Sequence, residues 1–181
     1  MFIIQKIRFS KDGLEPYPTS LRIIHWVKFL SYHKVQIQNI DESLNAQMSI
    51  LLDQLESHIL GNHLLENGFG LFFGAYYFQD QKLYQKAAEI LKTQLEEQIL
   101  EDGAHFELSP MYHQLMLYRV LDCINLVDNN SFFPKDILPF LKKKAAIMLG
   151  WLEQITFSQG DIPLLNDCAF GVNPTTLEIF D

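Results

Sequence analysis

The sequence has 181 residues, 48% of them hydrophobic, which is enough chain for one domain with a sizeable buried core. The 22 acidic residues outnumber the 14 basic ones and give a formal net charge of −8, which argues against a general nucleic-acid-binding or anionic-membrane-binding surface. No apolar run reaches the roughly 18 residues that span a bilayer, and the apolar part of the N-terminal segment is too short for a secretory signal, so the compartment stays open.

Helical periodicity dominates the sequence from residue 18 onward. The pattern predicts six helices, at residues 18–32, 41–59, 62–78, 80–99, 109–128 and 135–155. The third is apolar and aromatic around nearly its whole circumference and contains glycines that permit close backbone approach, so we expect it to be buried on all sides. The fourth has one apolar stripe and one charged face. The tail 171–181 gives no clear element.

Short connections between these helices make successive members antiparallel. Because inner and outer members alternate in burial, the pattern predicts an all-α fold of antiparallel αα-hairpins that form a partial, incomplete α/α toroid, as a single domain over residues 1–181. The starts of the first, third and fifth helices and the end of the sixth then lie at one end. We expect four polar segments to converge there and to build a binding cleft, namely 14–22, 61–63, 102–113 and 160–170.

The two cysteines are expected to stay unpaired. Cys123 lies several turns inside the helix that starts near Ser109, whereas Cys168 is placed close to the start of that helix. At a rise of about 1.5 Å per residue the two are roughly 20 Å apart. A disulfide requires a Cα separation of about 6 Å.

Several residues at the helix starts suggest either a helix-capping role or a role in catalysis or binding. Ser109 and Pro110 are typical of an N-cap and a first helical position, so we interpret them as structural. Asn62 follows Gly61 and is also explained as an N-cap. Tyr112 lies in the first turn of its helix, where the positive end of the helix dipole would stabilise a phenolate and help it act as a base. A core tyrosine that bonds a carbonyl is the simpler alternative.

Three histidines, His63, His105 and His113, fall in the converging segments and add titratable donors. A lone histidine is usually a satisfied polar residue, but three in one region indicate a site. No HExxH or paired CxxC signature accompanies them, so no metal site is predicted. The sequence also lacks a Gly-rich phosphate loop and a GxSxG elbow, which argues against nucleotide-dependent and serine-hydrolase chemistry.

Four stretches carry a family resemblance, in the order EPYPTSLRIIHWVKFL, GNHLLENGFGLFFGAYYF, EDGAHFELSPMYHQLML and GDIPLLNDCAFG. Together they resemble the toroid domain of the heparinase II/III-like polysaccharide lyases, a family that includes relatives of alginate lyases. The likeness covers residues 14–173. It implies an α/α toroid followed by a β-sandwich, cleavage of 4-linked uronic-acid polysaccharides by β-elimination, and no metal or organic cofactor.

The resemblance also implies roles for individual residues. Tyr112 resembles the family's catalytic acid/base, and Asn62 resembles the asparagine that neutralises the uronate carboxylate. His63 matches a histidine used in some members, and His113 sits beside the tyrosine as family histidines often do. Further substrate contacts are expected from Arg22, His105, Glu107, Asn166 and Asp167.

The sequence departs from the family pattern in its length. It has six predicted helices where a complete member has a longer toroid, and it ends soon after GDIPLLNDCAFG, so we expect it to lack the β-sandwich domain. Besides an acidic polysaccharide, the expected partners are therefore the missing sandwich domain or a second copy of the chain, with no nucleic acid and no membrane insertion. The resemblance implies a periplasmic or secreted protein.

An alternative function belongs to a different class. The chain could be a non-catalytic helical repeat module that binds a protein or a glycan on its concave face. In that case helix 62–78 of an incomplete toroid would need a partner to cover Phe69, Phe72, Phe73 and Tyr76.

Overall fold

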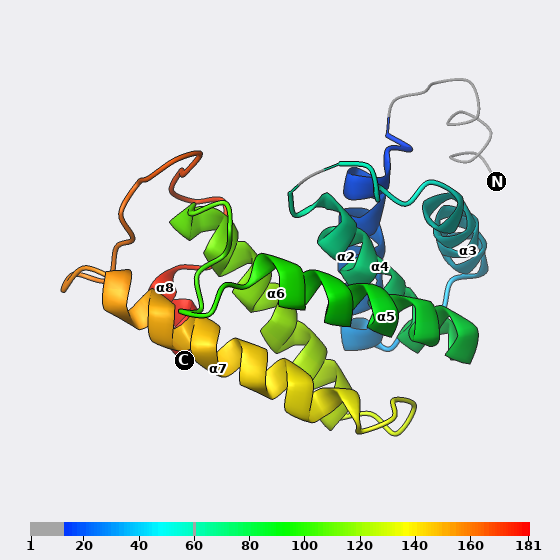
Figure 1. Ribbon diagram of the computed structural model, residues 1–181. Helices are drawn as coiled ribbons and strands as arrows, with labels where there is room; N and C mark the ends of the chain where they lie inside the picture. The colour runs from blue at the N-terminus through cyan, green and yellow to red at the C-terminus, as the bar shows by residue number, and fades with distance from the viewer. Residues whose placement is uncertain (1–12, 60) are drawn as a thin grey trace. The chain divides into compact units, whose positions relative to one another are not determined.

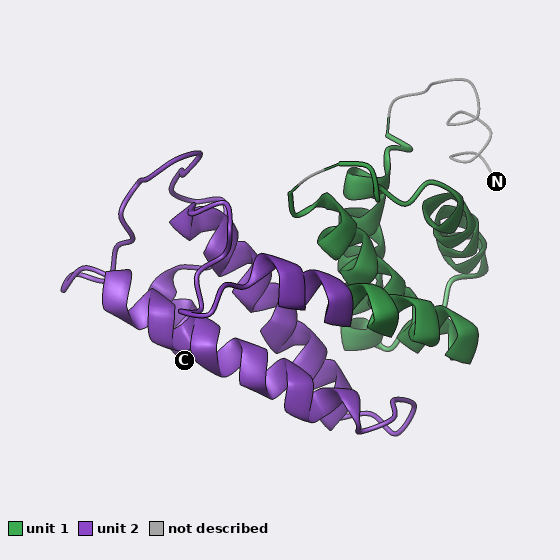
Figure 2. Cartoon of the chain, in the orientation of Figure 1, with its two compact units in different colours: residues 1–91 green, residues 92–181 purple. Residues whose placement is uncertain are grey.

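The computed structural model describes residues 13–59 and 61–181, and the chain forms two compact units, residues 1–91 and 92–181 (Figure 2). The described residues form α-helices and no strand, apart from one isolated antiparallel bridge between Ile99 and His105. The helices labelled in Figure 1 are α2 (Pro16–His33), α3 (Gln38–Asp53), α4 (His63–Phe78), α5 (Gln81–Gln98), α6 (Pro110–Asp128), α7 (Ile137–Ile155) and α8 (Thr176–Phe180).

This arrangement confirms the predicted all-α fold of helical hairpins. The six predicted helices correspond to α2 through α7, and neighbouring helices pack on each other within each unit. Helix α5 runs across the boundary between the two units (Figure 2). Over residues 13–59 and 61–181, none of the helices combines the length and the apolar character that crossing a bilayer requires. The curved toroid and the single-domain boundary stay predictions.

Helix α4 forms the core of the first unit. Every residue from Leu65 to Ala75 is buried, and α2 and α3 pack against this helix. The ring of Phe72 also meets Tyr84 at the start of α5, with 5.9 Å between the ring centroids. The expectation that Phe69, Phe72 and Phe73 need an outside partner is wrong, because these side chains are only 0%, 0% and 3% exposed.

The second predicted helix, 41–59, is shorter than its apolar periodicity indicates. Helix α3 ends at Asp53, and residues 54–59 form turns. The backbone N–H of Glu56 donates to Oδ1 of Asn67 at 3.0 Å, so it is not available for a helical bond. A contact made eleven residues away therefore holds this segment outside the helix.

The second unit is built on the hairpin of α6 and α7. Helix α6 begins as the sequence predicts, with Ser109 as the N-cap and Pro110 at the first helical position. The hydroxyl of Ser109 accepts a hydrogen bond from the backbone N–H of Tyr112 at 3.4 Å. In α7, Lys144 is buried and donates to Glu96 at the end of α5, with 2.9 Å between Nζ and Oε2.

The tail contains a short helix that periodicity did not predict. Helix α8 starts with a capping box, in which the backbone N–H of Glu178 donates to Thr175 Oγ1 at 3.3 Å and that of Thr175 donates to Glu178 Oε2 at 2.7 Å. Gln114 of α6 donates to Thr176 Oγ1 at 2.9 Å and so attaches α8 to α6. The Thr-x-x-Glu spacing was a readable signal for this helix start.

A glycine fixes the loop before α6 against α7. Gly103 has a φ of +94°, which favours glycine. A Cβ at this position would overlap the backbone carbonyl of Ile147. The loop that leads to Ser109 is therefore held close to the backbone of α7.

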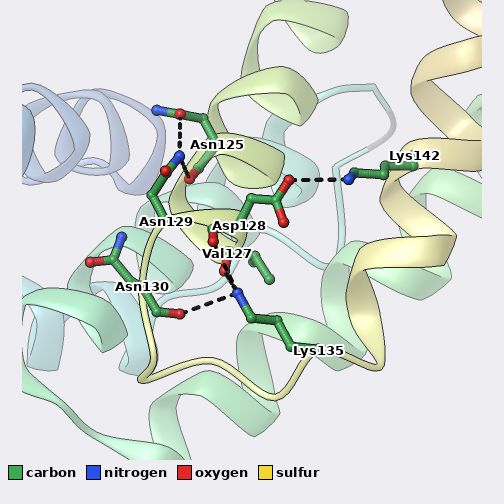
Figure 3. Close-up of polar contacts among 7 residues, drawn as sticks. All are labelled: Asn125, Val127, Asp128, Asn129, Asn130, Lys135 and Lys142. Atoms are coloured by element: carbon green, nitrogen blue, oxygen red, sulfur yellow. Dashed lines mark hydrogen bonds and ion pairs between the residues drawn. The ribbon is translucent and has the colours of Figure 1, made fainter.

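A lysine from the following loop closes the C-terminal end of α6 (Figure 3). Lys135 Nζ donates to the backbone carbonyls of Val127, of Asp128 at 3.2 Å and of Asn130 at 3.4 Å. Carbonyls at a helix end lack intrahelical donors and form the negative end of the helix dipole, so an ammonium group stabilises them in both respects. Lys142 of α7 adds an ion pair with the Asp128 carboxylate at 3.1 Å.

Lys135→Met should therefore lower the free energy of unfolding of the second unit by about 1 kcal/mol, because the carbonyls lose a cationic donor. Urea unfolding in a Trp26→Phe background, followed by the fluorescence of Trp151, measures this loss. Lys143→Met, on the exposed face of α7, is the matched control and should change the midpoint little. An equal loss in both variants would contradict the capping role of Lys135.

Candidate functional site

The first unit brings two of the predicted polar segments together. The ring of Tyr17, at the start of α2, lies against the ring of His63, at the start of α4, with 4.8 Å between the centroids. This contact confirms that segments 14–22 and 61–63 meet. The N-terminal ends of α2 and α4 therefore lie close together in this unit. The positive end of each helix dipole favours negative charge there.

Asn62 occupies the N-cap position of α4 but does not act as a cap. Its side chain makes no capping hydrogen bond, and the residue is only 6% exposed. Within the part of the chain that the structure describes, its amide nitrogen Nδ2 is buried and has no hydrogen-bond partner. The capping explanation of Asn62 therefore fails, and a buried donor without an acceptor costs about 1–3 kcal/mol.

His63 is held by a carboxylate that the sequence analysis missed. Its Nδ1 lies 3.0 Å from Oε1 of Glu56. The side chain of Glu56 is 9% exposed, whereas that of His63 is 39% exposed. The Nδ1 atom of His63 is thus hydrogen-bonded to a buried carboxylate, while part of the ring is exposed to solvent.

Arg22, predicted to contact substrate, is engaged within its own unit. Its Nε donates to Gln47 Oε1 of α3 at 2.9 Å, and its Nη2 donates to Thr19 Oγ1 at 2.9 Å. Burial lowers the pKa of Arg22, and the carboxylate of Glu15 opposes that shift. The bond to Gln47 joins α2 to α3, and the bond to Thr19 lies within α2.

The second unit brings the other two polar segments together. Asn166 donates through Nδ2 to the backbone carbonyls of Glu107 at 3.1 Å and of Leu108 at 2.9 Å. The sulfur of Cys168 lies 3.3 Å from the hydroxyl of Ser109 and accepts from the backbone N–H of Met111 at 3.2 Å. Segments 102–113 and 160–170 therefore meet at the start of α6, as predicted.

The second unit also shows the redox state of both cysteines and the positions of further predicted site residues. Cys168 lies at the start of α6 as expected, and both cysteines are free thiols. Asn166 acts on the loop backbone, Glu107 is half-buried, and Asp167 is exposed. Tyr112 is half-buried in the first turn of α6.

His105, predicted to contact substrate, and His113, predicted to act beside Tyr112, are fully buried at 0% exposure. His113 Nε2 lies 3.0 Å from the backbone carbonyl of Met148, and its ring lies 4.5 Å from that of Trp151. His105 Nε2 lies 3.1 Å from Oε1 of Gln98. In both rings Nδ1 is buried and has no partner among residues 13–59 and 61–181.

Burial also sets the charge state of these two rings. Burial lowers the pKa of each ring to about 4, and for His105 the nearby His113 contributes to this lowering. For His113, the bond to Met148 and the charge of Asp102 act in the opposite direction. Both imidazoles are therefore neutral at physiological pH and lie inside the unit. The structure does not place either one at an exposed surface.

Two surface cavities of the first unit are not lined by any of the predicted site residues. Surface cavities of about 330 and 360 Å³ in the first unit lie at the C-terminal ends of α4 and α2, and they include neither Asn62 nor His63. Across the described ranges, no three His, Cys, Asp or Glu side chains form a group that could hold a metal ion.

Comparison with known proteins identifies a family. The family described as Heparinase II/III N-terminus matches residues 43–177. The chain is also 27% identical over 114 residues to a heparin-sulfate lyase of Bacteroides stercoris, an alignment that covers 59% of this chain and 16% of the relative. The chain thus spans a small part of that relative's length. No solved structure matches the chain.

Proposed function

The chain belongs to the Heparinase II/III N-terminus family, and from this premise we propose that it is the helical part of a polysaccharide lyase that cleaves 4-linked uronic-acid polysaccharides by β-elimination. One observation carries the proposal. The amide of Asn62 is buried at the start of α4 with its donor group unsatisfied within the described residues, beside the half-exposed His63.

The chemistry of elimination explains why such a donor is needed. Removal of the C5 proton beside a carboxylate builds negative charge on that carboxylate, and a fixed donor aimed at it lowers the barrier. Asn62 Nδ2 supplies a donor, and the N-terminus of α4 supplies a positive dipole end. This step requires no metal ion or organic cofactor.

Tyr112 is the proposed acid/base. A tyrosine can take the C5 proton and protonate the departing O4 when the two groups lie on one face of the sugar. Its position in the first turn of α6 supports this role, because unpaired N–H groups there favour negative charge. Ser109 keeps the backbone of Tyr112 in place through the cap.

The remaining predicted residues divide into contact and support roles. His63 and Asp167 are accessible enough to touch a saccharide. His105, His113, Arg22 and Asn166 are proposed as structural supports, each within its own unit, since their polar groups are buried or already bonded to the protein. Glu107 stays a proposed substrate contact. We also propose that a β-sandwich domain or self-association completes the cleft.

A lyase assay tests the proposal. Incubation with alginate, heparan sulfate, hyaluronan or chondroitin should release an unsaturated uronate that absorbs in the ultraviolet. Asn62→Ala should lower the rate by about 10²–10³-fold, the usual effect of removing one donor to a developing anion. A carboxyl-reduced form of the best substrate is the control and should give no product. If none of the four polymers binds to the chain or is cleaved by it, the proposal fails.

A further inference from the structure

A buried hydrogen-bond chain runs from the backbone of Glu56 to the ring of His63. It begins with a donor whose direction is certain, since the backbone N–H of Glu56 donates to Asn67 Oδ1 at 3.0 Å. This bond fixes the orientation of the Asn67 amide, because its oxygen must face the backbone nitrogen of Glu56. Asn67 is 0% exposed, so water does not compete with this arrangement.

The amide nitrogen of Asn67 then has two acceptors. One hydrogen goes to Ser20 Oγ at 3.2 Å and the other to Oε2 of Glu56 at 3.0 Å. The hydroxyl of Ser20 donates its own hydrogen to the backbone carbonyl of Pro16 at 2.8 Å, so Ser20 can only accept from Asn67. The whole amide group of Asn67 and Oε2 of Glu56 therefore have assigned partners.

A close approach between two helices maintains this chain. A Cβ added at Gly70 of α4 would lie 2.9 Å from both the Cα and the Cβ of Ser20. Only a glycine lets α2 come near enough for the Ser20 hydroxyl to reach Asn67, one turn earlier on α4. The anchor of the chain is therefore built into the packing of α2 on α4.

The second oxygen of Glu56 determines the state of His63. Since Oε2 is occupied by Asn67, Oε1 is the atom that faces His63 Nδ1 at 3.0 Å. A carboxylate oxygen only accepts, so Nδ1 must carry the hydrogen. In the neutral ring the lone pair is then on Nε2. The neighbouring ring of Tyr17, with 4.8 Å between centroids, restricts rotation of the imidazole.

From this geometry we infer that Glu56, oriented by Asn67, is a positioning residue that fixes His63 as the Nδ1–H tautomer and so presents Nε2 as an acceptor for a hydrogen of the bound uronate. The inference rests on the proposed function for the identity of the substrate. The tautomeric state inferred for the His63 ring does not depend on the proposed function. Glu56 acts on the substrate only through His63.

The substitution Glu56→Gln should reverse the tautomer. Asn67 Nδ2 is a fixed donor, so the amide oxygen of the introduced glutamine would turn toward it and the amide nitrogen would face His63. That nitrogen would donate to Nδ1 and force the hydrogen onto Nε2. The side chain keeps its shape, so the fold should be preserved.

Nitrogen-15 NMR of the histidine rings in the full chain tests the inference. The spectrum of His63→Gln identifies the His63 signals among the 6 histidines. At a pH where the ring is neutral, the wild-type chain should show Nδ1–H, and Glu56→Gln should show Nε2–H. Glu42→Gln is the control and should leave His63 unchanged, because Glu42 is exposed on α3 and its carboxylate accepts from Gln38 at 3.0 Å.

The outcomes separate this inference from the proposed function. An Nε2–H ring in the wild-type chain overturns the inference whatever the activity, and so does an unchanged tautomer in a folded Glu56→Gln variant. Where lyase activity is present, Glu56→Gln should lower kcat/KM by about 10- to 100-fold, the effect of one mismatched polar pair. Absence of lyase activity together with the expected tautomers would contradict the proposed function but leave the positioning role of Glu56 intact.

Discussion

Replacement of Tyr112 by phenylalanine should lower the rate of elimination by about 10²–10⁴-fold, because the step loses the group that accepts and returns the proton. The fold should be unaffected. The backbone N–H of Tyr112 bonds Ser109, and the substitution does not touch that bond. The ring itself is retained.

Tyr118→Phe is the matched control for this prediction, since Tyr118 lies further along α6 and is also half-buried. Initial rates on the best polymer and thermal unfolding curves should be recorded for both variants. Wild-type activity in Tyr112→Phe would reject Tyr112 as the acid/base. A large loss in both variants would point to the stability of α6 instead.

Acidification should destabilise the second unit strongly through His105 and His113. Burial lowers the pKa of both rings to about 4, from about 6.5 in the unfolded chain. The unfolded state therefore binds protons first as the pH falls. The full stability is present above about pH 6.5, declines between about 6.5 and about 4, and then levels off with respect to these groups.

The expected loss at about pH 5 is on the order of 2 kcal/mol for each ring, or about 4 kcal/mol together. Urea unfolding followed by tryptophan fluorescence measures it. The chain has 2 tryptophans, so Trp26→Phe leaves Trp151, which lies against the ring of His113, as the reporter.

A direct titration provides the second measurement for the same prediction. In the folded chain, the ring signals of His105 and His113 should remain those of neutral imidazole until the pH approaches about 4, because burial holds each pKa near that value. Protonation of either ring near pH 6.5 without unfolding would contradict the burial argument.

Much of the helical architecture could be predicted because its causes are local. The apolar circumference of 62–78 indicated a core helix, and every residue from Leu65 to Ala75 is indeed buried. Ser109 and Pro110 predicted the start of α6, because capping interactions act within one turn of the helix. The convergence of 160–170 with the start of α6 followed from antiparallel connection alone.

The features that sequence reasoning missed depend on contacts between distant side chains. The predicted helix 41–59 includes Glu56, yet the N–H and the carboxylate of this residue both bond Asn67 of the next helix. His113 was expected beside Tyr112 at the site, and its burial follows from its packing against α7, where it meets the carbonyl of Met148. Neither the partner nor the burial is encoded in the local pattern around these residues.

Within the described residues the amide nitrogen of Asn62 is unsatisfied, and under the proposed function this implies a compromise between stability and substrate binding. A leucine of similar size at that position would bury no orphan donor, so the ligand-free protein holds less stability than its packing permits. In the proposed complex, a substrate carboxylate that accepts from Nδ2 would remove this deficit. Selection for a robust ligand-free fold alone would remove the asparagine, and its presence is what we expect of a protein maintained for what it binds.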